Sequence, residues 1–439
     1  MFVYHAAMEF PARLWRKLLP HLSIFLSFNV IQATQFILPL LALPWLARVL
    51  GPESYGLCLY MGIISGVVTP FMDWGFILGA TRDVAVNRGR DEAQGDILAD
   101  VLSAKALLAV CCLLACLLLA PVMSYALEYP GAYALAVLAG IARGVNPTWF
   151  FQGLGRSIQR MAVWDVASSA LVLLLVVVCV RAPGDWPLYS FLIALCKGSC
   201  YLFLIARQLR QYGHVSFSPR RGLRALTRHR ILFVGSLSAH VSARFTQLVL
   251  GYFLLPAQMG LLVTADKIAR AAVSLNNPAM QTIFPEISAL NHAGRAGGIP
   301  LMRLALLYTA TIMIAGAAVL WYIAPWLVDA VLGGSYAEMT PVLRTLCFFI
   351  PLQACNIVLA WQILVPLGKE RTQVRVQAAV AVFSLPAAVL LGHFWGLAGG
   401  ACLPVLLEGG IMLGFIPLVL RCRPEIFCGR KRTADPPPL

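Results

Sequence analysis

The chain has 439 residues, of which 60% are hydrophobic and 12% are charged, and its mean hydropathy is +0.79. A soluble domain carries about 25% charged residues, so this composition excludes a soluble protein. Apolar runs recur from Ile24 to Leu420 with no long polar interval, which predicts one membrane unit. The net charge of +15 reflects membrane topology and attraction to anionic lipid, because no nucleic-acid motif accompanies it.

Read in chain order, the apolar runs give about twelve candidate spans, each close to the roughly 20 residues that a helix needs to cross the hydrocarbon core. The runs are continuously apolar and do not alternate, which favours helices over a β-barrel. The predicted fold class is therefore an all-α polytopic membrane protein. The predicted spans are 21–48, 55–80, 97–123, 131–153, 163–181, 186–207, 231–255, 258–290, 301–326, 341–365, 374–395 and 397–420.

Lys and Arg residues in the predicted loops set the orientation of the spans. Alternate loops hold nearly all of these residues, whereas the loops on the other side hold only Arg48 and Arg181. Because basic residues are in excess in cytoplasmic loops, both termini are predicted to lie in the cytoplasm. The predicted organisation is a cytoplasmic lead-in at 1–20, an N-lobe at 21–207, a basic cytoplasmic inter-lobe loop at 208–230, a C-lobe at 231–420 and a basic, proline-rich cytoplasmic tail at 421–439.

Motifs for catalysis and for cofactor binding are missing from the sequence. The predicted loops are too short for a soluble catalytic domain, and no G-x-x-x-x-G-K-[ST] phosphate cradle is present. Most cysteines fall inside spans without disulfide or metal-ligand spacing. The sequence therefore predicts a transporter, not an enzyme, with no bound cofactor and no metal.

Basic residues inside the spans point to an anionic substrate. A charge at the centre of a spanning helix costs about 2.5–3.5 kcal/mol, so these side chains are expected to face protein or water. Lys105 and Arg344 lie nearer to helix ends, from which they can reach the interface. Arginine binds phosphate oxygens through paired hydrogen bonds, and the mid-span cations therefore predict a diphosphate-binding site. Those cations are Arg143, Lys197, Arg244, Lys267 and Arg270.

Deep carboxylates are candidates for ion coupling. Asp73, Asp266 and Glu408 lie well inside spans, where a desolvated carboxylate can exchange a proton or bind Na⁺. The alternative is that they pair with the buried cations, as Asp266 and Arg270 can do at a spacing of four residues. The other acidic residues within spans are predicted to lie at the cytoplasmic interface, namely Asp100, Asp165 and Glu286.

A faint internal repeat relates the two halves of the chain. Residues 49–57 (VLGPESYGL) resemble residues 254–261 (LLPAQMGL), and each stretch joins the first and second helices of a six-helix set. Two six-helix lobes around a central cavity suit alternating access. Gly75 and Gly79 have the spacing that allows close helix contact.

Several motifs closely resemble Wzx-type polysaccharide repeat-unit (O-antigen) flippases. They are GPESYG at 51–56, DWGF at 73–76, ATRDVA at 80–85, NPTWFFQG at 146–153 and ADKI at 265–268. The resemblance implies the two-lobed, MATE-like fold of the multidrug/oligosaccharidyl-lipid/polysaccharide (MOP) exporter superfamily. It also implies transfer of undecaprenyl-diphosphate-linked oligosaccharide to the outer leaflet of the bacterial cytoplasmic membrane. Coupling to an H⁺ or Na⁺ gradient, and work beside a polymerase and a chain-length regulator, are part of this expectation.

Three other functions stay open on the sequence. A MATE-like multidrug antiporter usually needs acidic residues for cationic drugs, whereas here mid-span cations outnumber deep carboxylates. A lipid-II flippase has a similar substrate but usually carries additional helices. A membrane glycosyltransferase or polymerase typically needs a sizeable extramembrane loop with catalytic residues, and no such loop is predicted.

Overall fold

The structure is a computed structural model in which the described residues form helices joined by short turns, with no strand among them. The predicted lead-in, most of the first span and nearly all of the predicted tail lie outside the described residues. The described residues are 40–123, 125–155, 158–213, 216–276 and 298–422, with Met280, Ile283, Ile287 and Ile426.

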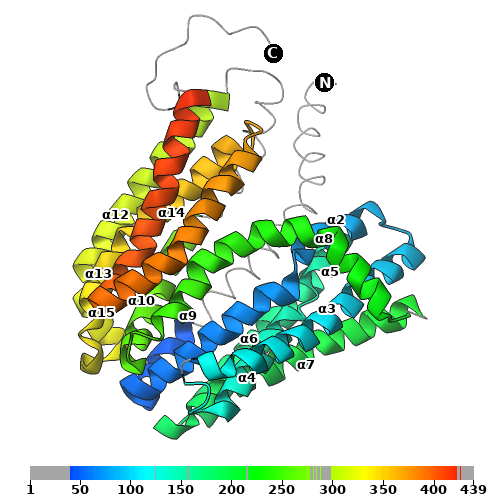
Figure 1. The fold of residues 1–439 in the computed structure, drawn as a ribbon, viewed down its shortest axis with the longest axis horizontal. Helices are drawn as coiled ribbons and strands as arrows, with labels where there is room; N and C mark the ends of the chain where they lie inside the picture. The colour runs from blue at the N-terminus through cyan, green and yellow to red at the C-terminus, as the bar shows by residue number, and fades with distance from the viewer. Residues whose placement is uncertain are drawn as a thin grey trace, which may run out of the picture. The chain divides into compact units, whose positions relative to one another are not determined.

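Helices cover most of each described span (Figure 1). Residues 40–73 are helical, with a positive φ of 72° at Gly51. Two π-helical turns follow later in the chain: η3 (Val241–Phe245) joins α8 to α9, and η5 (Val358–Leu364) extends α14. The α-helices are α2 (Phe76–Val86), α3 (Asp91–Leu119), α4 (Pro130–Gly144), α5 (Thr148–Leu154), α6 (Ile158–Cys179), α7 (Trp186–Tyr212), α8 (Pro219–His240), α9 (Thr246–Leu250), α10 (Pro256–Ser274), α12 (Gly298–Leu332), α13 (Met339–Cys347), α14 (Phe349–Ile357) and α15 (Glu370–Cys422).

Helix α15 contains two of the predicted spans. Its backbone leaves helical geometry at Gly396, where φ is 51° and ψ is −126°, a conformation that suits a residue without a Cβ atom. The predicted spans 374–395 and 397–420 meet at this residue, so the predicted boundary between them is confirmed.

The outer surfaces of the helices are apolar. Seven helices among the described residues are long and apolar enough to cross a membrane. Large side chains such as Leu117 and Leu118 of α3 and Ile314 of α12 are exposed along them. Soluble proteins rarely expose contiguous apolar surface of this kind. The chain is therefore a multi-pass membrane protein.

The segment 208–230 was predicted as a basic loop, but most of it is helical. Helix α8 covers it from Pro219 onward. The buried residues Gly222, Ala225 and His229 recur every three or four positions, as on one face of a helix. The high arginine content of the segment therefore concealed an amphipathic helix.

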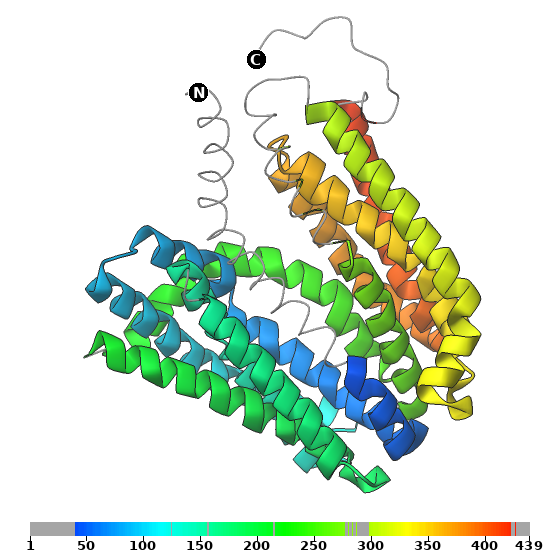
Figure 2. The same cartoon turned by 180° about the vertical axis from the view of Figure 1, so that it is seen from behind.

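The chain divides into two compact units. Unit 1 contains Met61–Leu237 and the described residues that end at Leu50, whereas unit 2 contains Gly51–Tyr60 and the described residues from Ser238 onward. Within unit 1, α4 and α6 both pack against α7, and α2 packs against α5. Within unit 2, α10, α12 and α14 contact α13, and α15 contacts α9, α13 and α14 (Figures 1 and 2).

Helix α8 is fastened to the rest of unit 1 by aromatic stacking and close backbone contact. The Trp74 and Phe233 rings stack with centroids 3.9 Å apart. A Cβ atom on Gly79 would lie 2.1 Å from His229 Nδ1, and Gly75 contacts the same helix, which confirms the predicted close approach. Burial lowers the pKa of His229 below its ordinary value, even though Asp83 lies 3.6 Å away and opposes the shift.

The two repeated stretches, around Gly56 and around Gly260, contact each other within unit 2. A Cβ atom on Gly56 would lie 1.7 Å from the carbonyl oxygen of Pro256, and one on Gly260 would lie 3.1 Å from the Cα atom of Gly56. The hydroxyl groups of Tyr55 and Thr264 are hydrogen-bonded at 2.7 Å. Gly56 and Gly260, which match in the two repeated stretches, therefore face each other. The close backbone contact leaves no room for a side chain at either position.

We expect Gly56→Ala to lower the free energy of unfolding by about 1–3 kcal/mol, because the added methyl group overpacks a backbone contact. The measurement is the melting temperature of the purified protein in detergent. Gly62→Ala is the matched control in the same helix, since no described atom lies within 4 Å of its added Cβ. Equal melting temperatures for the two variants would contradict the close contact at Gly56.

Candidate functional site

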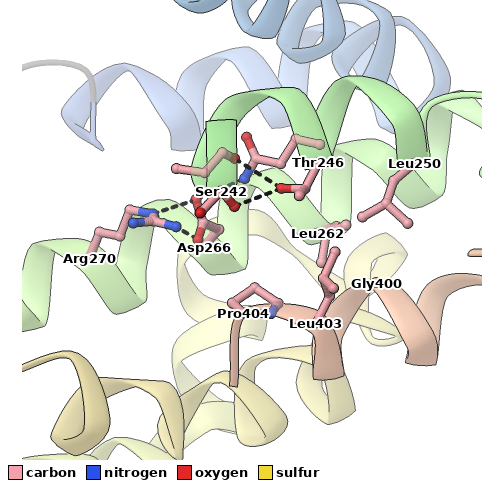
Figure 3. A pocket seen from close by; sticks show the side chains of 11 residues that line it. Ser242, Thr246, Leu250, Leu262, Asp266, Arg270, Gly400, Leu403 and Pro404 are labelled. Carbon is pink, nitrogen blue, oxygen red and sulfur yellow. Dashed lines mark hydrogen bonds and ion pairs between the residues drawn. The ribbon is translucent and has the colours of Figure 1, made fainter. Parts of the chain in front are cut away.

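Unit 2 contains a cavity with two adjoining chambers. The small chamber, shown in Figure 3, is narrow, and its empty space is about 280 Å³ including the open mouth. The large chamber has a volume of about 890 Å³ including its open mouth. Ser242, Ala243, Arg270 and Pro404 line both chambers, so they mark the place where the two join.

Both π-helical turns border the large chamber. Turn η3 supplies Ser242 and Ala243, and turn η5 supplies Ala360 and Trp361. The amide of Val365 donates to the carbonyl of Ala360 at 3.0 Å, five residues earlier. Single π-helical turns inside α-helices are frequent at functional sites. Two of them beside one cavity mark this cavity as the candidate site of unit 2.

Arg270 is held at the junction of the two chambers. Its Nε atom lies 2.9 Å from each carboxylate oxygen of Asp266, and its Cζ atom lies 5.0 Å from the centroid of the Phe349 ring. Neither of its terminal nitrogens donates a hydrogen bond to a described residue. Arg270 is therefore fixed in position while its two terminal amino groups stay available to a ligand (Figure 3).

Asp266 is a buried residue beside the small chamber, and its carboxylate holds Arg270 in position. Only 2% of Asp266 is exposed, and its Oδ2 atom also accepts a hydrogen bond of 2.9 Å from Gln247 Nε2. The Oε1 atom of Gln247 has no hydrogen-bond partner among the residues that the structure describes. The sequence left open whether Asp266 pairs with a cation, and the structure shows the pair with Arg270 at i,i+4.

Glu408 in the large chamber is held by neutral amides. Asn356 Nδ2 donates to Glu408 Oε2 at 2.7 Å and to the Glu408 carbonyl at 2.8 Å. Gln353 also hydrogen-bonds to the Glu408 side chain. No cation forms a salt bridge with Glu408 among the described residues, which distinguishes it from Asp266.

Lys197, predicted as a substrate-binding cation, forms a buried ion pair in unit 1. Its Nζ atom lies 2.8 Å from Asp165 Oδ1, and the Tyr201 hydroxyl donates to the same oxygen at 2.6 Å. The side chain of Asp165, which was predicted to lie at the cytoplasmic interface, is completely buried within unit 1. The position of each residue within its span could not reveal this pair, because the two partners are 32 residues apart in the sequence.

Arg143 and Lys105 lie close together in the fold near the end of α4. Arg143 is exposed, makes no hydrogen bond or ion pair with a described residue, and is within electrostatic range of Lys197. Lys105 was predicted to reach the membrane interface. In the structure only 3% of it is exposed, and it donates to the carbonyl of Gly144. Lys105 thus satisfies a backbone acceptor at the C-terminal end of α4.

The remaining predicted residues lie outside the cavity lining. Arg244 is part of η3 and Lys267 of α10, and both are partly buried in unit 2. Asp73 is partly buried in unit 1 and lies near Lys105. Of the predicted site residues, the cavity of unit 2 brings together Asp266, Arg270 and Glu408.

Comparison with known proteins shows which family this helical protein resembles. Residues 24–291 match the family of polysaccharide biosynthesis proteins. The chain belongs to this family. A Shigella dysenteriae protein described as an O-antigen transporter is 24% identical over 381 residues, which cover 86% of this chain and 94% of that protein.

Solved transporter structures share the fold of this polysaccharide biosynthesis protein. An inward-facing multidrug resistance MATE transporter of the MOP superfamily matches with a TM-score of 0.71 at 17% identity, over 91% of this chain and 98% of that one. The lipid II flippase MurJ in an inward-closed conformation matches with a TM-score of 0.68 at 12% identity, over 91% and 87% of the two chains. The MATE-like fold expected from the motifs is therefore confirmed.

Neutral residues of the large chamber were not among the predicted site residues. The chamber is lined by Gln353, Asn356, Trp361 and Gln377. Three of these carry amides, and an amide inside an apolar span must find a partner or face a cavity. Charge alone therefore did not indicate the full lining of the chamber in this family member.

We expect Asp165→Asn to destabilise the protein by about 3–5 kcal/mol, because it leaves the ammonium group of Lys197 buried without a counter-charge. The double variant Asp165→Asn/Lys197→Gln removes both charges and should recover most of that loss. Melting temperature in detergent and surface polysaccharide in complemented cells are the two measurements. A stable double variant that has lost all surface polysaccharide would contradict a structural role for Lys197 and restore it to the substrate site.

Proposed function

We propose that this protein is a flippase that carries undecaprenyl-diphosphate-linked oligosaccharide repeat units from the inner to the outer leaflet of the bacterial cytoplasmic membrane. The product would serve O-antigen, capsule or exopolysaccharide synthesis, beside the polymerase and chain-length regulator of the same pathway. Membership of the polysaccharide biosynthesis family and the fold of known transporters support this proposal. The observation that carries it is Arg270 at the junction of two chambers, where its terminal nitrogens make no hydrogen bond to a described residue.

In this mechanism the diphosphate binds to the terminal nitrogens of Arg270. Phosphate oxygens match the planar guanidinium fork, and the charge of arginine persists at physiological pH. Arg143 is the corresponding candidate of unit 1, because the charge of Lys197 is already balanced by Asp165. Arg244 and Lys267 stay candidates on the basis of charge and depth alone. The prenyl chain would remain in lipid while alternating access carries the head group across.

We further propose that Glu408 exchanges the coupling ion, H⁺ or Na⁺. Its hydrogen-bond partners are neutral amides, and Arg270 acts on it electrostatically without a salt bridge. Uptake of a cation would therefore not have to break a direct contact with a guanidinium. Asp266 is less suited because both of its oxygens accept from Arg270. Asp73 is the candidate of unit 1, close to Lys105.

Reconstitution tests the proposed function. Purified protein is placed in liposomes that carry the lipid-linked oligosaccharide on the inner leaflet, and an impermeant lectin outside reports its appearance. We expect faster appearance than in protein-free liposomes, and restored surface polysaccharide when the chain complements a strain that lacks its own flippase. Equal rates with and without protein, or new glycosidic bonds made by the protein, would overturn the proposal.

The cavity also gives a specific reason to test a multidrug antiporter of the same fold. Two carboxylates and one guanidinium line its chambers, so the cavity of unit 2 is less cationic than the sequence predicted. Efflux of a fluorescent lipophilic cation from proteoliposomes discriminates the two functions. Competition for that efflux by the lipid-linked oligosaccharide would favour the flippase, whereas efflux without competition would favour the antiporter.

A further inference from the structure

The large chamber combines groups that recognise neutral polar molecules. Gln353, Asn356 and Gln377 bring amides to it, Glu408 brings a carboxylate, and Phe349 and Trp361 bring aromatic rings. Amides donate and accept hydrogen bonds at fixed geometry. A diphosphate offers acceptors alone, so an amide carbonyl or a carboxylate repels it, whereas sugar hydroxyl groups can both donate and accept.

Asn356 lines this chamber and has a buried acceptor without a donor among the described residues. Its amide nitrogen is committed to Glu408, which fixes the orientation of the side chain. Its Oδ1 atom has no hydrogen-bond partner in the described part of the chain, although only 5% of the residue is exposed. A buried acceptor without a donor is costly to leave unpaired. A ligand hydroxyl that displaces the atoms covering Asn356 Oδ1 and donates to it would remove that cost.

Gln377 and Trp361 are placed to complete such a contact. Gln377 is partly exposed in the chamber and makes no hydrogen bond with a described residue. Trp361, on the π-helical turn η5, is 55% exposed. A rigid indole ring provides a flat apolar surface with little loss of conformational freedom on binding, which suits the C–H face of a pyranose ring.

We propose that the large chamber is a saccharide-binding subsite, with Asn356, Gln377 and Trp361 as its specificity-determining residues. This subsite rests on the proposed flippase function and assigns the two parts of the substrate to different places. The diphosphate binds at Arg270, where the chambers join, and the sugars extend into the large chamber.

Two probes separate the sugar from its carrier. One is undecaprenyl diphosphate, and the other is the undecaprenyl-diphosphate-linked oligosaccharide extracted from a strain that accumulates it. Binding of each lipid to the purified full-length protein is measured for wild type, Gln377→Ala and Trp361→Leu. Trp326→Leu is the matched control, because this indole is 72% exposed on α12 and does not line the chamber.

We expect Gln377→Ala and Trp361→Leu each to weaken binding of the glycosylated lipid by about tenfold, the size of a lost hydrogen bond or stacking contact. Binding of undecaprenyl diphosphate should change less than twofold, and Trp326→Leu should alter neither affinity. Wild-type affinities for both lipids in the two variants, or equal losses for both lipids, would overturn the subsite alone. Wild-type protein that binds neither lipid would overturn the proposed function together with the subsite.

Discussion

Arg270→Gln is expected to reduce transport of the lipid-linked oligosaccharide by at least about tenfold, because a charge-assisted hydrogen bond contributes about 1.5–3 kcal/mol. The two terminal nitrogens of Arg270 are the groups that the fold leaves available beside both chambers. Glutamine keeps a polar side chain but loses the charge and the planar fork. The measurement is the rate at which the saccharide appears at the outer leaflet of reconstituted liposomes.

The same substitution also leaves Asp266 buried without its counter-charge, which costs about 3–5 kcal/mol of stability. Asp266→Asn/Arg270→Gln removes both charges and should restore the melting temperature while transport stays low. Arg344→Gln is the matched control, since this guanidinium packs on the Trp321 ring at 4.4 Å, outside the cavity lining. A double variant with wild-type transport would remove Arg270 from the substrate site.

Hydropathy predicted the helices because one physical requirement dominates inside a bilayer. Each backbone polar group must be satisfied within its own segment, so an apolar run of sufficient length has to be helical. The boundary at Gly396 was predicted to within a residue for this reason. The segment 208–230 lies in the predicted inter-lobe region, where that requirement does not hold, and its helix was missed.

Partners of the buried charges were far harder to predict. Asp266 and Arg270 share one helix, so their spacing of four residues was enough to suggest the pair. Lys197 and Asp165 lie on different helices, and only packing brings them together. The depth of a charge in its span therefore predicted that it needs a partner, but tertiary structure decided whether that partner is protein or ligand.

The contacts of the neutral residues that line the cavity also depend on tertiary structure. Asn356 and Glu408 are 52 residues apart, and neither position alone suggests a hydrogen bond between them. The hydrogen bonds to Glu408 also orient the amide, and Asn356 Oδ1 is left without a donor from any described residue. The recognition chemistry of the large chamber therefore arises from an arrangement of helices, and no sequence motif encodes it.

Glu408→Gln is expected to abolish accumulation driven by an ion gradient while downhill movement continues. A gradient of one pH unit stores about 1.4 kcal/mol per proton, enough for roughly tenfold accumulation with one proton per substrate. Glutamine still accepts the hydrogen bond of Asn356 but cannot exchange a proton or bind Na⁺ by charge. The measurement is the ratio of lipid-linked oligosaccharide between the leaflets of liposomes with an imposed H⁺ or Na⁺ gradient, which should fall to one.

Glu338→Gln supplies the control, because this exposed glutamate next to α13 is remote from the chamber lining. It should accumulate substrate as the wild type does, and Asp266→Asn should also retain the gradient response because Asp266 serves mainly to hold Arg270. Undiminished accumulation by Glu408→Gln would move the coupling role to Asp73. The physical reason for expecting the opposite is that Glu408 is the cavity carboxylate held by neutral amides. Arg270 acts on it electrostatically but forms no salt bridge with it in the described part of the chain, so the carboxylate oxygens have no cation in contact.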